Sequence, residues 1–157
     1  MADSLKQRIE LDMKTALLGG DRFRGEVLRG LKAAILNEEI ATKNREAGLS
    51  DDAIEKVIVR EVKKRKEAAT LYAQNNRAEL AENEDREAAI LGEYLPEQLD
   101  EAELNKIVVA KVAELDAIGD PKKMGAVIGA IKSAVGNTAD GALLAKLVRD
   151  AINSDKL

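Results

Sequence analysis

Apolar residues recur every three or four positions along most of this chain, which is the spacing that one face of an α-helix requires. The first stripe runs from Leu5 to Leu17 and ends at Gly19-Gly20, and a second begins after Asp21. No segment offers a strand candidate with alternating apolar and polar residues. The pattern therefore predicts an all-α fold.

Helix-start and helix-stop residues divide the rest of the chain. Ser50 is a good N-cap for a long third helix, and Asn75-Asn76 should end that helix. A fourth helix follows, and Pro96 ends it, because proline cannot continue the hydrogen-bond ladder and disfavours helical geometry in the preceding residue. We place a domain boundary there, between a multihelical N-terminal domain, 1–95, and a small three-helix C-terminal domain, 96–157.

Capping signals locate the three helices of the C-terminal domain. Asp100 and Glu103 fit a capping box at the start of the fifth helix. Asp120 precedes Pro121, which suits the first position of the sixth helix. Gly136 is placed to end that helix, and Asp140 then caps the last one.

Glycines interrupt two of the expected helices. Gly25 and Gly30 should weaken the second helix by about 1 kcal/mol each relative to alanine, unless close helix packing compensates. Gly125 and Gly129 lie four residues apart on one side of the sixth helix, a spacing that lets another helix backbone approach closely. We favour this packing interpretation, and the alternative is that the glycine face meets RNA.

Composition removes much of enzyme chemistry. The 157 residues include no Cys and no His, so thiolate nucleophiles, sulfur-ligated metals and the usual near-neutral base are missing. We predict no catalytic residue, no cofactor and no metal site. Glu84 with Glu87, and the basic run from Arg60 to Lys66 with its interleaved glutamates, fit solvated and ion-paired helix faces.

Charge and hydropathy limit the class of partner. The net charge of −4 argues against nonspecific coating of nucleic acid, although a local basic patch is compatible with it. No apolar run approaches the roughly 20 residues that span a bilayer, and the first residues lack the apolar region of a secretion signal. We therefore expect no membrane partner and a cytoplasmic location.

Four motifs are spread along the chain: Leu28-Arg29-x-Leu31-Lys32-Ala33-Ala34-Ile35, Tyr94-Leu95-Pro96-Glu97-Gln98-Leu99, Met124-Gly125-x-Val127, and Gly136-x2-Ala139-Asp140-Gly141 before Leu147-Val148. Together they resemble the YqeY family, and the resemblance covers nearly all of the chain. The family's C-terminal part is similar to the tail of the B subunit of the glutamine-dependent tRNA amidotransferase, GatB, which helps to hold tRNA. The resemblance implies a tRNA-associated tail on a helical N-terminal domain, without amidase chemistry of its own. Ala126 and Gly129 stand where the family pattern often has lysine, which removes possible phosphate contacts.

Three functional hypotheses follow. The first is a noncatalytic accessory protein that associates with tRNA or with a tRNA-charging or tRNA-amidating complex. The second is a helical protein–protein adaptor that does not bind RNA. The third is a carbon–nitrogen ligase activity with glutamine as amide donor, which would need a catalytic partner. For the first, the RNA-binding residues should be the cations and glycines of the C-terminal domain, Lys122, Lys123, Gly125, Gly129, Lys132 and Arg149.

Overall fold

The computed structural model describes residues 4–154, and that part of the chain is helical with no strand. The all-α prediction is confirmed. Contacts divide the chain into two compact units, Met1–Leu95 and Pro96–Leu157, which we call unit 1 and unit 2. That each unit is an independent domain stays a prediction.

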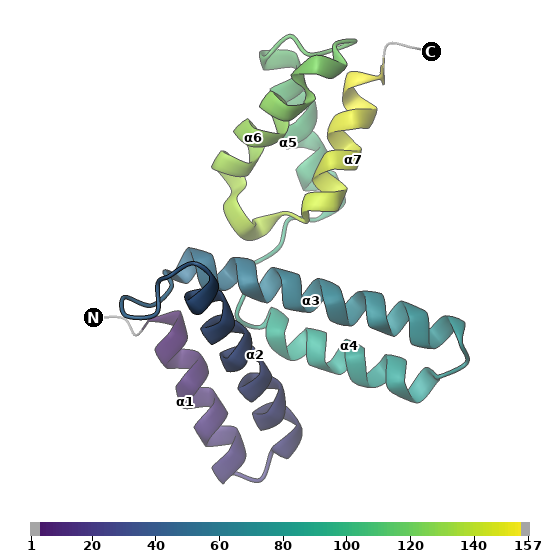
Figure 1. The fold of residues 1–157 in the computed structure, drawn as a ribbon. Helices are drawn as coiled ribbons and strands as arrows, with labels where there is room; N and C mark the ends of the chain where they lie inside the picture. The colour runs from purple at the N-terminus through teal and green to yellow at the C-terminus, as the bar shows by residue number, and fades with distance from the viewer. Residues whose placement is uncertain (1–3, 155–157) are drawn as a thin grey trace. The chain divides into compact units, whose positions relative to one another are not determined.

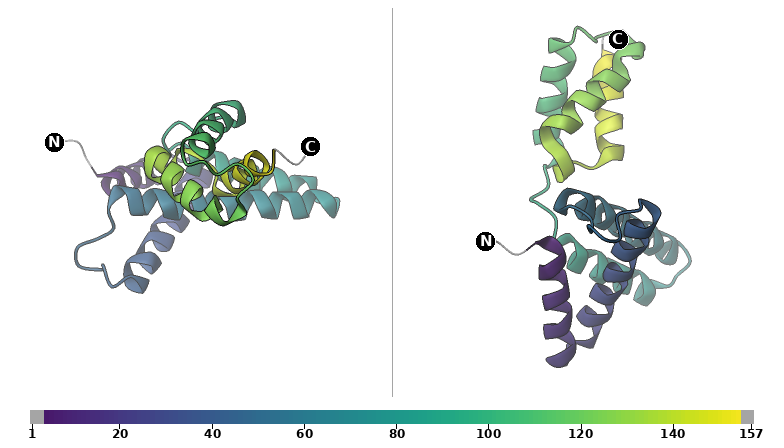
Figure 2. Two further views of the ribbon diagram at one scale, coloured as in Figure 1. Left: turned by 90° about the horizontal axis from the view of Figure 1, so that it is seen from above. Right: turned by 60° about the vertical axis from the view of Figure 1, so that its left-hand side comes forward.

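Unit 1 consists of two helical hairpins (Figures 1 and 2). The first pairs α1 (Leu5–Leu18) with α2 (Arg22–Ala41), and the second pairs α3 (Asp51–Gln74) with α4 (Ala78–Gly92). One apolar core joins all four helices, because each presents its stripe to the others. Its buried residues are Leu5, Ile9, Val27, Leu28, Leu31, Ile35, Ile54, Val57, Ile58, Leu91 and Tyr94.

Side-chain caps set the starts of three of these helices. Ser50 Oγ accepts from the N–H of Ala53 at 3.2 Å, and Asp21 Oδ1 accepts from the N–H of Arg24 at 3.1 Å. At α1, Ser4 and Gln7 form a reciprocal capping box. Each cap satisfies an N–H group that has no partner inside its helix.

The two glycines of α2 have different surroundings. A Cβ atom added at Gly25 would lie 2.4 Å from Leu17 Cδ2 of α1, whereas one added at Gly30 would meet no heavy atom within 4 Å beyond its own helix backbone. Close packing of α1 against α2 therefore explains Gly25 and offsets the cost of a glycine inside a helix. At Gly30 the structure shows no such compensation.

Unit 2 is a three-helix unit made of α5 (Glu101–Glu114), α6 (Met124–Val135) and α7 (Gly141–Ile152). Short 3-10 turns, Pro121–Lys123 and Gly136–Thr138, flank α6. Its core is the shared apolar face of the three helices, with the buried residues Leu104, Val108, Val112, Ala117, Val127, Ile131, Leu144, Leu147, Val148 and Ile152.

The capping predictions for unit 2 are confirmed, with one correction. Asp100 and Glu103 form the capping box, and Asp140 Oδ1 accepts from the N–H of Ala142 at 2.8 Å. Gly136 ends α6 with a φ of 58°, in the left-handed region that favours glycine. The correction concerns Pro121, which begins a 3-10 turn and not α6 itself; the α-helix starts at Met124.

The apolar stripe of the fifth helix predicts that it runs on until Ile118-Gly119-Asp120 closes it, but the helix is shorter. It ends at Glu114, and Asp116 then takes a positive φ of 51°, so the chain turns there. Within residues 4–154, no helix is both long enough and apolar enough to cross a membrane.

Candidate interface on helix α6

Helix α6 has a buried side and an exposed side. Val127 and Ile131 are buried in the core of unit 2, and these residues lie one helical turn apart. Gly125, Gly129 and Lys132 are exposed. Residues two positions apart point to nearly opposite sides of a helix. Gly125 and Gly129 each lie two positions from Val127, so they face away from the buried side that Val127 and Ile131 form.

The exposed glycines have no neighbour in the described part of the chain. A Cβ atom built at Gly125 or Gly129 would meet no heavy atom within 4 Å beyond the backbone of its own helix. The interpretation that these glycines admit a neighbouring helix of the same domain is therefore wrong. They leave a stretch of helix backbone open to whatever approaches from outside.

Lys123 has a partner within unit 2. Its Nζ atom donates to the main-chain oxygens of Leu115 at 3.1 Å and Asp116 at 2.9 Å, at the end of α5. A cation at this place satisfies carbonyl groups without helical partners and complements the negative end of the helix dipole. The ammonium of Lys123 is therefore used inside the fold, and we do not assign it to an interface.

The other predicted cations are available to a ligand. Lys122 precedes α6, Lys132 lies in its last turn, and Arg149 lies on α7; all are exposed. Among residues 4–154, the side chains of these cations have no hydrogen bond or ion pair. Lys122, Gly125, Gly129 and Lys132 thus occur on or beside one helix, whereas Arg149 belongs to another.

Sequence reasoning missed Lys146. It is exposed on α7, three residues before Arg149, so the two cations lie on neighbouring positions of one helix surface. The i, i+3 spacing was the signal that could have identified it.

The charges of unit 2 are separated along the sequence. Residues 121–152, which include all of α6 and α7, contain five basic and two acidic residues, while residues 97–120 contain seven acidic and two basic ones. The net charge of the whole chain conceals this separation. Helices α6 and α7 are therefore the positively charged part of unit 2.

The basic run of α3 is ion-paired at three of its five cations, Arg60, Lys64 and Arg65, as predicted for an ion-paired helix face. Arg60 pairs with Glu38 at 2.8 Å, and Arg65 pairs with Glu61 at 2.7 Å and with Glu87 at 3.0 Å. These cations already have carboxylate partners, which makes the run a poorer phosphate surface than unit 2 offers.

The carboxylates Glu84 and Glu87 do not form a metal centre in the described residues, where no group of three or more potential ligands gathers. Burial, and then repulsion by Glu87, raise the pKa of the Glu84 carboxyl above its usual value. Because Arg65 binds Glu87, this part of the surface is an ion-paired helix face.

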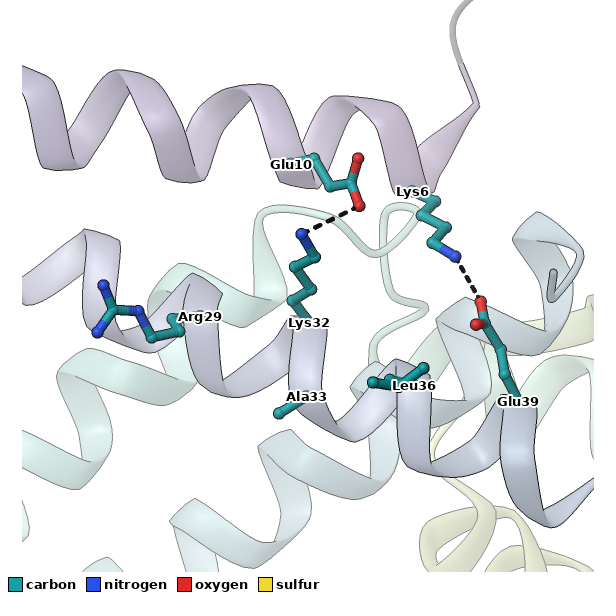
Figure 3. A pocket seen from close by; sticks show the side chains of 7 residues that line it. All are labelled: Lys6, Glu10, Arg29, Lys32, Ala33, Leu36 and Glu39. Atoms are coloured by element: carbon teal, nitrogen blue, oxygen red, sulfur yellow. Dashed lines mark hydrogen bonds and ion pairs between the residues drawn. The ribbon is translucent and has the colours of Figure 1, made fainter. Parts of the chain in front are cut away.

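A pocket of about 310 Å³ lies between α1 and α2 (Figure 3). Lys6 pairs across it with the buried Glu39 at 2.7 Å, and Lys32 pairs with Glu10 at 3.4 Å. Its third cation, Arg29, pairs with Glu26 at 3.3 Å. Because every cation around the pocket has its own carboxylate, the lining favours neither sign of ligand. The Lys6–Glu39 and Lys32–Glu10 pairs connect α1 to α2, whereas the Arg29–Glu26 pair lies within α2.

The fold and this surface define an all-helical protein of two compact units with an exposed, glycine-bearing and basic helix face in the second. A family profile for Yqey-like proteins matches residues 6–152, so the chain belongs to the YqeY family.

Two curated relatives share part of the sequence. The chain is 29% identical over 109 residues to Altered inheritance of mitochondria protein 41, mitochondrial, of Lachancea thermotolerans, covering 69% of this chain and 52% of that protein. It is 30% identical over 86 residues to the protein of the same name of Kluyveromyces lactis, covering 55% of this chain and 45% of that protein. The chain thus spans about half the length of the curated relatives it matches.

These relatives contradict the cytoplasmic location that we predicted, since both are named as mitochondrial proteins. The prediction rested on the lack of a secretion signal and of a membrane-spanning run. Neither observation excludes mitochondrial targeting, which uses amphipathic, arginine-rich segments instead.

Proposed function

We propose that this protein is a noncatalytic accessory protein that associates with tRNA, alone or within a tRNA-charging or tRNA-amidating complex, through the exposed side of α6. The observation that carries the proposal is the open backbone at Gly125 and Gly129 between the exposed cations Lys122 and Lys132. The resemblance of unit 2 to the tail of GatB supports tRNA as the nucleic acid.

The surface suits a phosphate backbone for two physical reasons. Without side chains at Gly125 and Gly129, a bulky ligand can approach the helix itself. Lysines at both ends of this stretch then supply charge to phosphate oxygens, and Lys146 and Arg149 on α7 add to the positive charge of the same unit.

Binding should be weak and strongly dependent on salt. Lys123 is already hydrogen-bonded to the end of α5, and Ala126 contributes no charge, so only a few cations remain for phosphates. Each phosphate contact releases condensed counterions, and a rise in salt concentration opposes that release.

Filter binding of total tRNA at low salt tests the proposal. We expect Lys132→Glu to weaken binding by about 1 kcal/mol or more, roughly fivefold to tenfold, because it removes a cation and adds repulsion. Lys66→Glu is the matched control, since Lys66 is an exposed helical lysine of unit 1. Absence of binding by the wild-type chain, or an equal loss in the control, contradicts the proposal.

A second candidate function is a helix-docking adaptor. The observation that favours it is the spacing of four between Gly125 and Gly129 on a surface that no helix of the described chain covers. The same variants separate the two functions. A partner helix should be lost in Gly129→Leu but retained in Lys132→Glu, whereas tRNA binding should suffer in both.

A further inference from the structure

The chain passes from unit 1 to unit 2 at Leu95 and Pro96. We infer that this connection is a short joint, confined to Leu95, Pro96 and Glu97. On either side of these residues, hydrogen bonds and an ion pair hold the chain to unit 1 and to unit 2 respectively. The inference concerns the chain's own conformational freedom and does not depend on the proposed tRNA association.

On the side of unit 1, the fastening is made by Glu93 and Tyr94. The Glu93 carboxylate accepts hydrogen bonds from both terminal nitrogens of Arg24, at 2.7 Å and 3.1 Å. This bidentate geometry is the strong form of an arginine–carboxylate ion pair. Arg24 belongs to α2, so the residue just after α4 is bound to the first helical hairpin.

Tyr94 adds a buried contact to the same hairpin. Its hydroxyl donates to Asp12 Oδ2 at 2.5 Å, its ring lies 4.8 Å from the guanidinium carbon of Arg8, and it is only 4% exposed. Burial, together with the hydrogen bond to Asp12, raises the pKa of the Tyr94 phenol well above its usual value, so the hydroxyl keeps its proton. The chain is therefore held to α1 and α2 until Tyr94.

On the side of unit 2, the fastening begins at Gln98. Its Nε2 atom donates to the main-chain oxygen of Asn137 at 3.0 Å, and the N–H of Leu99 donates to the oxygen of Thr138 at 2.8 Å. Both acceptors belong to the 3-10 turn Gly136–Thr138. The chain thus joins unit 2 before α5 begins.

The residues between these fastenings make few backbone contacts. The N–H of Leu95 donates to the oxygen of Gly92 at 3.1 Å, and the oxygen of Pro96 accepts from Gln98 Nε2 at 2.8 Å, but Pro96 has no N–H. In residues 4–154, the N–H groups of Glu97 and Gln98 have no acceptor. Three residues span about 10 Å when fully extended, and Pro96 restricts its own φ and the conformation of Leu95. Rotation about the connection is therefore limited to a few backbone torsions.

Residue-resolved hydrogen exchange on the full chain tests this joint. The N–H groups of Glu97 and Gln98 should exchange at least about tenfold faster than those of Leu95 and Leu99, after correction for intrinsic rates. Equal exchange across these residues, whether all fast or all slow, would overturn the inference.

Two variants examine each fastening separately. Tyr94→Phe should accelerate the exchange of Leu95 and leave Leu99 unchanged, because it removes only the bond to Asp12. Gln98→Ala should accelerate Leu99 and leave Leu95 unchanged, because it removes the side-chain bonds to the main-chain oxygens of Asn137 and Pro96 but not the bond from the Leu95 N–H to Gly92. If both variants changed both amides equally, the two sides would not be fastened independently, and the inference would be wrong.

A glutamate-specific protease offers an independent measurement, since Glu93 and Glu97 are both exposed. Cleavage should occur after Glu97 and not after Glu93 in the wild-type chain, while Arg24→Gln should add cleavage after Glu93. Equal cleavage at the two glutamates in the wild-type chain would contradict the joint.

Discussion

The Lys123 ammonium lies 2.9 Å from the main-chain oxygen of Asp116, so a lysine next to α6 in the sequence stabilises the end of α5. Its neighbour Lys122 has an exposed side chain and caps nothing in the described structure. Adjacent lysines of the same charge therefore have different roles, one in the fold and one available to a partner.

Replacing each lysine should separate these roles. Lys123→Met should lower the free energy of unfolding by about 1 kcal/mol, because it removes a charged donor from helix-end carbonyls. Lys122→Met should leave stability within about 0.5 kcal/mol of wild type, as exposed substitutions usually do. Urea unfolding of both variants checks this prediction. An equal loss of stability in the two variants would contradict the assignment of Lys123 to the fold.

The glycines of α2 should respond to alanine in opposite ways. Gly30→Ala should stabilise the protein by about 1 kcal/mol, because alanine favours the helix and its methyl group has open space. Gly25→Ala should destabilise it by about 1 kcal/mol, because the methyl group would overlap Leu17 Cδ2 and displace that side chain. Thermal unfolding of both variants decides it. A destabilising Gly30→Ala would show that this position is more crowded than the structure indicates.

On α6, stability and binding should change in opposite directions. Gly129→Ala should raise the free energy of unfolding by up to about 1 kcal/mol, since no atom outside its own helix backbone lies within 4 Å of the added methyl group. The same substitution should weaken binding of any ligand that contacts the helix backbone there. A variant that is less stable than wild type would show that Gly129 packs within unit 2.

The Arg24–Glu93 pair should contribute to acid sensitivity. The hydrogen bond from Arg24 lowers the pKa of the Glu93 carboxyl below its usual value. Because the folded-state pKa is the lower one, the stabilisation is complete above the unfolded-state pKa and disappears as the pH falls through the folded-state value. Arg24→Gln should thus lose less stability than wild type below about pH 5.

This pH effect should be small, at most about 1 kcal/mol, because the Glu93 side chain is 51% exposed and solvent screens the pair. Urea unfolding at pH 7 and at pH 3.5 measures it, with Arg29→Gln on the exposed surface of α2 as the matched control. Identical pH dependence in Arg24→Gln and wild type would refute this role for the pair.

Local signals could be predicted from the sequence because their causes lie within a few residues. Ser50, Asp100 and Asp140 each cap a helix by accepting from an N–H two or three residues later, so residue type and spacing were enough. Gly136 ended α6 as predicted because its positive φ favours glycine.

Contacts between helices could not be predicted in this way. The bond from Lys123 depends on α5 ending at Glu114 and on the turn at Asp116, which bring the lysine to the carbonyl groups. The exposure of Gly125 and Gly129 could have been predicted from the sequence, because the apolar residues Val127 and Ile131 identify the buried side of α6 and the glycines lie on the other side. We gave more weight to the glycine spacing than to the position of that apolar stripe.

The most direct test of the central claim is a titration of the isotopically labelled full chain with total tRNA at low salt, followed by residue-resolved NMR. The account predicts that the backbone signals of Gly125 and Gly129 shift or broaden first, and that those of α1 to α4 change little. It also predicts that Lys132→Glu weakens the effect and that added salt reverses it. No change at Gly125 and Gly129 at saturating tRNA, or changes centred on unit 1, would contradict the account.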